Sequence, residues 1–243
     1  MFFFLPIMPF SSIILLYILV AIIPAIFLLR YIYKHDTIEK EPPALIGSLI
    51  LCGVGAALCS IVLEGIGNLI LDNTVSQRSP YYLLILAFVV VAAVEEGTKL
   101  FFLKKRSWND WNFSHLYDGV LYSAAVSLGF AAFENITYVF SYGLSVVASR
   151  ALFAIPGHLG FSVFMGVFYG RAKLCDNRGD VRGRKLNLIL GYLSAVLLHG
   201  FYDACAMQGT RGATLVFYLF VAAMYIIVYR MIKSASQNDR PLY

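Results

Sequence analysis

The sequence predicts an all-α polytopic membrane protein, a bundle of about seven transmembrane helices. Of its 243 residues, 60% are hydrophobic and only 14% are charged, whereas a soluble domain is about 45–50% apolar and about 25% charged. The hydrophobic residues form runs of roughly 20 or more, the length that a membrane-spanning helix needs. Lys and Arg lie between these runs, so the formal charge of +5 sets topology and does not indicate a nucleic-acid partner.

Seven apolar runs are long enough to be spans. We expect helices over residues 10–33, 44–71, 81–103, 118–142, 148–169, 186–207 and 213–232. The first run is longer than the apolar core of a signal peptide and has no basic segment before it, so we expect a retained helix. No water-soluble domain is apparent. We therefore expect one transmembrane domain over residues 1–243, with a polar, mobile tail at 233–243.

The basic residues distinguish the two faces of the predicted bundle. The loops after the first, third and fifth helices, together with the tail, contain 15 of the 19 Lys and Arg, and the longest of these loops covers residues 171–185. The opposite side has only Arg78, Arg150 and Arg211. Because cytoplasmic loops are enriched in Lys and Arg, the basic side is expected to be cytoplasmic. The N-terminus is then outside and the C-terminus is cytoplasmic.

The third run contains three charged residues that are unusual in a span, Glu95, Glu96 and Lys99. Each charge at the centre of a membrane helix costs roughly 2.5–3.5 kcal/mol on insertion scales, so such groups indicate a function. Lys99 lies four residues after Glu95 and three after Glu96, and both spacings allow contact along a helix. Adjacent glutamates point about 100° apart, so only one can face a site squarely. A structural ion pair that joins helices is the alternative.

Other predicted spans also contain polar side chains. Five ionisable residues and one asparagine lie within them: Glu64, Glu134, Asn135, His158, His199 and Asp203. His199 and Asp203 are four apart and share a helix face, which suits two ligands of one metal or an aspartate that orients a histidine. Singly, each is equally well explained by helix–helix hydrogen bonding. Their accumulation in one small bundle favours a functional site.

The order of these motifs resembles that of the PrsW-type intramembrane protease family, which belongs to the wider superfamily of CAAX prenyl proteases and bacteriocin-processing enzymes. The resemblance covers about residues 30–205. It is carried by Glu95-Glu96-x-x-Lys99, Phe130-x-x-x-Glu134-Asn135 and His199-x-x-x-Asp203, together with Asp36-x-x-Glu39-Lys40-Glu41-Pro42 and Pro156-Gly157-His158.

The resemblance implies a protease in the bacterial cytoplasmic membrane that cuts a membrane-anchored regulatory protein such as an anti-sigma factor. The implied catalytic residues are Glu95, Glu96, Glu134, His199 and Asp203, with Lys99, Asn135 and His158 in supporting positions. Glu64 belongs to none of these motifs, and we add it as a supporting residue because it is an ionisable residue within a predicted span. A carboxylate in an apolar site can act as general base on water. His199, His158 or Asn135 could donate to the developing oxyanion. We favour Glu95 as the base, because Glu96 can pair with Lys99.

No cofactor is firmly implied, but a metal is an open alternative. Glu134, His158, His199 and Asp203 could supply three or four ligands to a divalent metal such as zinc, which would activate the water instead. The sequence contains no HExxH pattern, which would be the stronger zinc signal. Glutamate-activated and metal-activated water are therefore both retained.

Depth along the helices tests the idea of a single site. Straight-helix counting places Glu96 roughly 12 Å from the cytoplasmic lysines, but His199 and Asp203 roughly 20–26 Å from that side. A single site then needs tilted helices, an overhang, or a kink at Gly97 or Gly200. Two other functions use the same residues: a proton- or ion-coupled transporter or channel, and an inactive relative that binds membrane helices.

Overall fold

The computed structural model describes residues 10–243, and within this range the chain folds into seven helical segments and no β-strand. The segments are α1 (Phe10–His35), α2 (Pro43–Thr74), a run of α3 (Tyr82–Ile85), η1 (Leu86–Ala92) and α4 (Ala93–Ser107), α5 (Leu116–Tyr142), a run of η2 (Leu144–Val146), α6 (Val147–Ser149), η3 (Arg150–Ala154) and α7 (Ile155–Asn177), α8 (Val181–Met207) and α9 (Arg211–Gln237). Six of the seven are long and apolar enough to cross a membrane. The predicted all-α membrane architecture is confirmed.

The basic connection between α7 and α8 is much shorter than the loop at residues 171–185 that we expected. Helix α7 continues to Asn177, and α8 begins at Val181. Gly179 adopts a φ of 74°, a conformation that ends the helix readily because glycine has no Cβ. The Asp180 carboxylate then accepts a hydrogen bond from the Gly183 N–H and caps α8. Both helices therefore continue beyond their apolar runs, and the short turn at Gly179 and Asp180 joins them.

The C-terminal residues pack against the bundle, whereas the sequence led us to expect a mobile tail. Helix α9 continues to Gln237. Beyond it, the Arg240 carbonyl accepts from the Leu116 N–H at 3.1 Å, and the Leu242 N–H donates to the Ser114 carbonyl at 2.8 Å. Leu242 is buried. The tail therefore satisfies backbone groups at the start of α5 that the helix itself leaves without partners.

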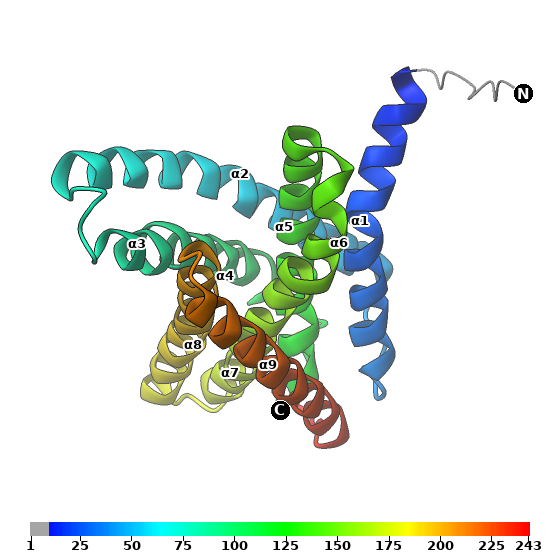
Figure 1. Cartoon of the computed structure of the whole chain (residues 1–243). Coiled ribbons are helices and arrows are strands. Elements are labelled where there is room, and N and C mark those ends of the chain that lie inside the picture. Colours follow the sequence, from blue (N-terminus) through cyan, green and yellow to red (C-terminus); the bar gives the residue numbers. More distant parts are fainter. Residues whose placement is uncertain (1–9) are drawn as a thin grey trace, which may run out of the picture.

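Helix α5 forms the centre of the bundle and packs against α1, α2 and α7 (Figure 1). Glycines let α5 and α7 approach until their backbones touch. A Cβ at Gly119 would lie 2.6 Å from the Gly170 nitrogen, and one at Gly166 would lie 2.7 Å from the Gly119 carbonyl oxygen. Helices in lipid associate through this kind of close packing, because burial of apolar surface gives no net drive there.

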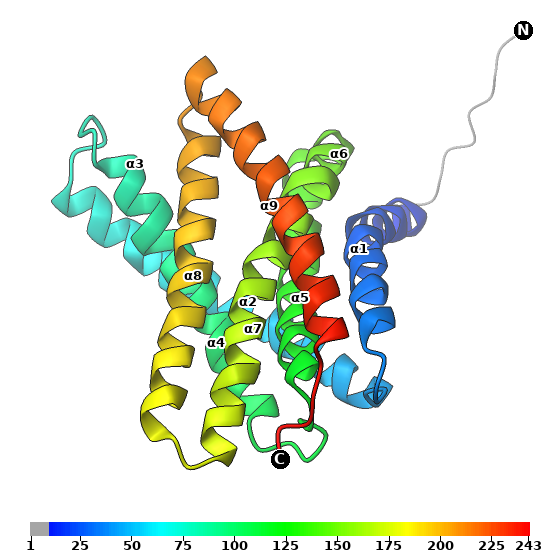
Figure 2. The ribbon, with the colours of Figure 1, turned by 90° about the horizontal axis from the view of Figure 1, so that it is seen from below.

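Helix α2 and the α3–α4 run form a hairpin that crosses the other helices (Figure 1), and Figure 2 shows its tip projecting to one side of the bundle. Helices α1, α5 and α8 run along the bundle instead. Distances along the α3–α4 run therefore do not measure depth relative to α5 and α8. This crossing removes the depth mismatch that straight-helix counting predicted for Glu95 and Glu96.

Candidate active site

A π-helical stretch precedes the glutamate pair. The stretch, η1, ends at Ala92, three residues before Glu95. The Tyr192 hydroxyl of α8 donates to the Ala93 carbonyl at 2.9 Å and fixes the junction with α4. Short π-helical stretches in α-helices are frequent at functional sites because they change the direction of the following side chains.

A second π-helical stretch, η3, precedes His158. Pro156 has no N–H, so the Leu152 carbonyl lacks its usual helical partner. The Tyr225 hydroxyl of α9 donates to that carbonyl instead. On the other side, the Ser127 hydroxyl of α5 donates to the His158 carbonyl at 2.9 Å. Two neighbouring helices therefore hold the backbone around His158.

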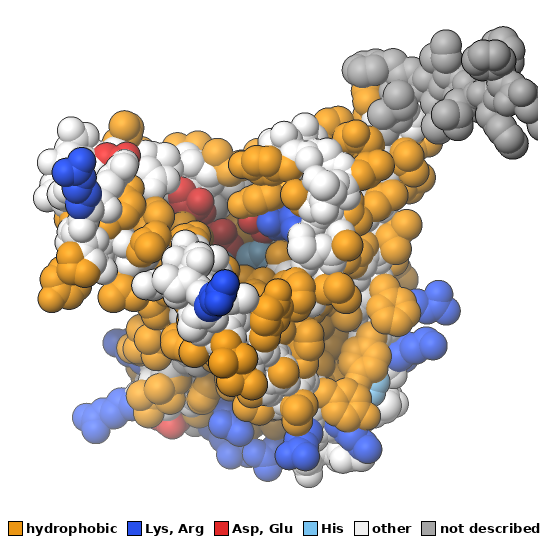
Figure 3. Space-filling model, in the orientation of Figure 1, with side chains coloured by type: hydrophobic (Ala, Val, Ile, Leu, Met, Phe, Trp, Pro, Cys, Tyr) orange, Lys and Arg blue, Asp and Glu red, His pale blue; other side chains and the backbone are white. Residues whose placement is uncertain are grey.

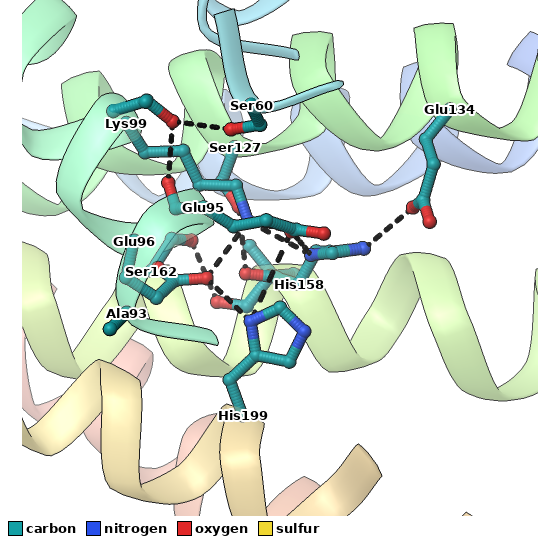
Figure 4. Close-up of polar contacts among 12 residues, drawn as sticks. Ser60, Ala93, Glu95, Glu96, Lys99, Ser127, Glu134, His158, Ser162 and His199 are labelled. Carbon is teal, nitrogen blue, oxygen red and sulfur yellow. Dashed lines mark hydrogen bonds and ion pairs between the residues drawn. The ribbon is translucent and has the colours of Figure 1, made fainter. Parts of the chain in front are cut away.

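The Lys99 ammonium joins the glutamate pair to His158 (Figure 4). Its nitrogen lies 3.0 Å from Glu95 Oε2, 2.8 Å from Glu96 Oε1 and 3.2 Å from His158 Nδ1. All four side chains are buried. An ammonium has three protons, and each has an acceptor here. The two contacts within α4 follow the expected three- and four-residue spacings, whereas the histidine contact depends on the packing of α7.

His199 contacts one carboxylate through each ring nitrogen. Nδ1 lies 2.9 Å from Glu96 Oε1, and Nε2 lies 3.3 Å from Asp203 Oδ2. The Phe161 ring stacks on the imidazole with centroids 4.7 Å apart. Helix α8 can approach closely at this point because the next residue is Gly200, where a Cβ would lie 2.3 Å from the Phe88 ring. Packing of α8 on η1 thus brings His199 to Glu96.

His158 lies between Lys99 and Glu134. Because Lys99 donates to Nδ1, the neutral ring has its proton on Nε2, which donates to Glu134 Oε2 at 2.9 Å. The Arg150 guanidinium contacts the same oxygen at 2.8 Å. His158 and His199 therefore share one arrangement, in which the outer nitrogen, Nε2, contacts a carboxylate and Nδ1 faces the glutamate pair.

Arg150 is a site residue that the sequence analysis missed, because we counted it only as a charge on the less basic face. Its Nε donates to Asn135 Oδ1 at 2.8 Å, and its guanidinium stacks on Tyr138 at 3.8 Å. Asn135 in turn donates to the Ala21 carbonyl of α1 and is fully buried. The asparagine thus links helices rather than facing a reacting group. In the sequence, Arg150 lies about two helical turns before His158, and this spacing was the one indication that it could reach the same site.

These side chains open into a cavity of ≈ 380 Å³. The acidic, basic and histidine residues that line it are Glu64, Glu95, Glu134, Arg150, His158, His199 and Asp203. Figure 3 shows acidic, basic and histidine side chains at the floor of a hollow in an otherwise apolar surface. Glu96 is fully buried behind this lining. Glu64 reaches the cavity from α2 and makes no hydrogen bond or ion pair within residues 10–243.

Four residues are placed to hold a metal ion. Glu95, Glu96, His158 and His199 each offer one ligand atom, and these atoms lie within 4.8 Å of one another. Glu96 Oε2 is buried and has no partner in the described part of the chain. Imidazole nitrogens and carboxylate oxygens are a common zinc donor set, so these residues fit the group.

Glu134 and Asp203, which the sequence predicts as possible metal ligands, are not among these four residues. In the structure they contact the outer nitrogens of the two histidines. Carboxylates in that position typically orient metal-binding histidines. Lys99 contacts three of the four candidate ligands. A metal ion and the Lys99 ammonium therefore compete for the same residues.

Comparison with known proteins decides the family. A model described as PrsW family intramembrane metalloprotease matches residues 41–229. The chain belongs to the PrsW family of intramembrane proteases. Protease PrsW of Oceanobacillus iheyensis is 34% identical over 218 residues, which are 89% of this chain and 94% of the relative. Protease PrsW of Geobacillus kaustophilus is 32% identical over 220 residues, or 90% and 91% of the two chains.

A further PrsW relative, from Bacillus subtilis, is 30% identical over 182 residues, which are 75% of this chain and 78% of the relative. No solved structure matches the chain significantly. The PrsW resemblance drawn from the motif series is thus confirmed. The membrane-spanning helices and the family together identify an integral membrane protein and a hydrolase.

Proposed function

We propose that this PrsW family member is an endopeptidase that hydrolyses a peptide bond of a membrane-anchored regulatory protein, such as an anti-sigma factor, in a bacterial cytoplasmic membrane. The main supporting observation is that Glu95, His158 and His199 converge on one cavity within the apolar bundle. Carboxylates and histidines inside a membrane also suit a transporter. Membership in a protease family favours hydrolysis.

Glu95 is our candidate general base. Its carboxylate lines the cavity, whereas that of Glu96 is enclosed by Lys99 and His199. A water beside Glu95 transfers a proton to the carboxylate while its oxygen attacks the scissile carbonyl. Glu95 then returns the proton to the nitrogen of the leaving amine as the C–N bond breaks. Lys99 balances the charge of the glutamate pair throughout.

The two histidines are our candidates for stabilising the oxyanion. Both are buried and have partners on both ring nitrogens, so their orientation is set before substrate binds, and a ring N–H that donates to the oxyanion has to exchange its present partner for the substrate oxygen. Preorganised donors of this kind contribute about 3–4 kcal/mol each to the transition state where one has been removed. Glu134 and Asp203 contact the outer nitrogens of the two rings and hold the rings in place.

A divalent metal such as zinc remains the alternative activator of water. Glu95, Glu96, His158 and His199 would hold it, and it would supply Lewis-acid activation of the water and of the scissile carbonyl. Lys99 would then leave the ligand atoms that it contacts. Glu134 and Asp203 keep their role in orienting the histidines in either case.

The substrate is expected to reach the site from the less basic face. The cavity opens away from the edge where most Lys and Arg side chains lie (Figure 3). If the basic face is cytoplasmic, as the distribution of Lys and Arg predicts, the N-terminus is outside, the C-terminus is inside, and the cavity opens toward the outer half of the membrane.

Cleavage of a membrane-anchored candidate substrate by the purified protein tests this proposal. We expect Glu95→Gln and His199→Ala to lose activity by about a hundredfold or more while remaining folded. The matched control is Asp72→Asn, an exposed carboxylate outside the motif series and the cavity. A chelator arm separates metal-activated from glutamate-activated water. Equal cleavage by all variants would overturn the proposal, as would a proton flux that depends on Glu95 without any cleavage.

A further inference from the structure

A second cavity, of ≈ 560 Å³, lies between α5, α7 and α9 on the basic face, away from the candidate active site. Apolar side chains, including Val120, Val167 and Ile227, form much of its wall. Two guanidinium groups, those of Arg171 and Arg230, also line it. Figure 2 shows the three helices side by side. The volume is in the range of small-molecule binding sites.

The two arginines line the same cavity from neighbouring helices, α7 and α9. Arg171 is six residues before the end of α7, and Arg230 is seven residues before the end of α9. At 1.5 Å per residue, each arginine lies about 10 Å along its helix from the C-terminal end. Val167 and Ile227 lie about one turn deeper, and Ser234 lies one turn nearer the surface. The wall thus changes from apolar to cationic to polar, as a lipid changes from acyl chain to headgroup.

Neither guanidinium has an anionic partner in residues 10–243, where Arg106, Arg150 and Arg184 each pair with a carboxylate. Arg171 and Arg230 are both exposed. Two like charges at the edge of one apolar cavity repel each other unless an anion lies between them. Guanidinium groups are well suited to phosphate, because their N–H groups match its oxygens in pairs.

We propose that this cavity binds an anionic glycerophospholipid, with the phosphate between Arg171 and Arg230 and an acyl chain along the apolar wall. Basic cavities between transmembrane helices on one face of a bilayer are typical sites for anionic headgroups. The apolar wall favours a lipid over a free anion. A bound lipid would join α7, which carries His158, to α9, so it should stabilise the folded protein.

The test compares lipid binding by purified full-length protein in detergent. The lipid is dioleoyl phosphatidylglycerol, with dioleoyl phosphatidylcholine and glycerol phosphate as the other arms. Binding is read from lipid adducts in native mass spectrometry and from the rise in Tm. The test variant is Arg171→Gln/Arg230→Gln. The matched control is Arg178→Gln/Arg182→Gln, which removes the same charge from exposed positions on the same face but outside the cavity.

We expect phosphatidylglycerol to bind the wild type and the control equally and to raise their Tm, while the test variant binds it about tenfold or more weakly. Phosphatidylcholine should bind more weakly than phosphatidylglycerol in the wild type, and glycerol phosphate should leave Tm unchanged. Each single arginine variant should show an intermediate loss, which keeps the test decisive if the double variant is unstable. Equal binding by test and control variants, no preference for the anionic lipid, or a full response to glycerol phosphate would overturn the proposal.

Discussion

The Arg150 guanidinium lies 2.8 Å from Glu134 Oε2, the same oxygen that His158 Nε2 contacts at 2.9 Å. Two residues, Glu134 and His158, thus connect the guanidinium to the Lys99 ammonium, which meets the opposite nitrogen of the same histidine. A chain of polar contacts runs from Arg150, which lines the cavity, to the glutamate pair. We infer that Arg150 is a positioning residue, which acts through Glu134 on His158.

Replacing Arg150 should impair cleavage without removing any group that we assign to the chemistry. We expect Arg150→Gln to lower kcat about 10- to 100-fold, the range seen when a partner behind a site residue is lost. Arg150→Lys should recover part of the activity, because it keeps the charge beside Glu134. Steady-state kinetics would separate kcat from KM. The control is Arg211→Gln, an exposed arginine on the same face. Unchanged kcat in Arg150→Gln would remove Arg150 from the site.

Lys99 should be essential for stability and should oppose metal binding. Lys99→Met leaves the buried carboxylates of Glu95 and Glu96 without their counter-charge, and breaking a buried pair in this way costs about 3–5 kcal/mol. Thermal unfolding in detergent would measure the loss, and adding Glu96→Gln should restore part of it.

The same Lys99→Met variant should bind zinc more tightly than the wild type in a metal-content assay. Weaker zinc binding would contradict the competition between Lys99 and the metal.

Gly200 should be required for contact between α8 and η1. In Gly200→Ala the new Cβ would meet the Phe88 ring at 2.3 Å, and overpacking of this kind costs about 1–3 kcal/mol. The helices would separate at this point and move His199 away from Glu96, so both Tm and cleavage should fall. Phe88→Ala in the same chain should restore part of each. Gly212→Ala is the control, because a Cβ there meets nothing within 4 Å.

Glu41 should make stability fall as pH rises. It lies in the loop between α1 and α2 and is only 2% exposed. Burial raises its pKa from 4.5 to about 7, and the nearby carboxylates of Asp36 and Glu39 add to the rise. The folded state therefore holds this proton more tightly than the unfolded chain. Stability should decrease between pH 4.5 and about 7, by at most about 3 kcal/mol from this group.

Thermal unfolding across this pH range would measure the effect. Glu41→Gln should flatten the slope, because an amide does not titrate. A smaller slope of the same sign should remain, since burial also raises the pKa of Asp36. Asp36→Asn is thus a second variant that should act in the same direction. A wild-type slope that Glu41→Gln leaves unchanged would rule out Glu41 as the titrating group.

The sequence by itself determined the membrane class, the number of helices and the contacts within each helix. Apolar runs of span length form helices, because a backbone in lipid has to satisfy its hydrogen bonds internally. The contacts of Lys99 with Glu95 and Glu96, and of His199 with Asp203, follow from three- and four-residue spacings. Helix geometry is the same in every protein, so such pairs can be read from residue numbers.

Only the tertiary structure decided which polar residues meet across helices. Glu96 and His199 are 103 positions apart, and Lys99 and His158 are 59 apart. Their contacts depend on the crossing of the α2–α4 hairpin and on the close approach at Gly200, neither of which a helical spacing encodes. The packing of η3, α5 and α7 likewise brought Arg150 to Glu134 and Glu134 to His158. Residue spacing fixes neighbours along one helix, whereas side-chain volumes at each crossing fix how far and at what angle two helices approach.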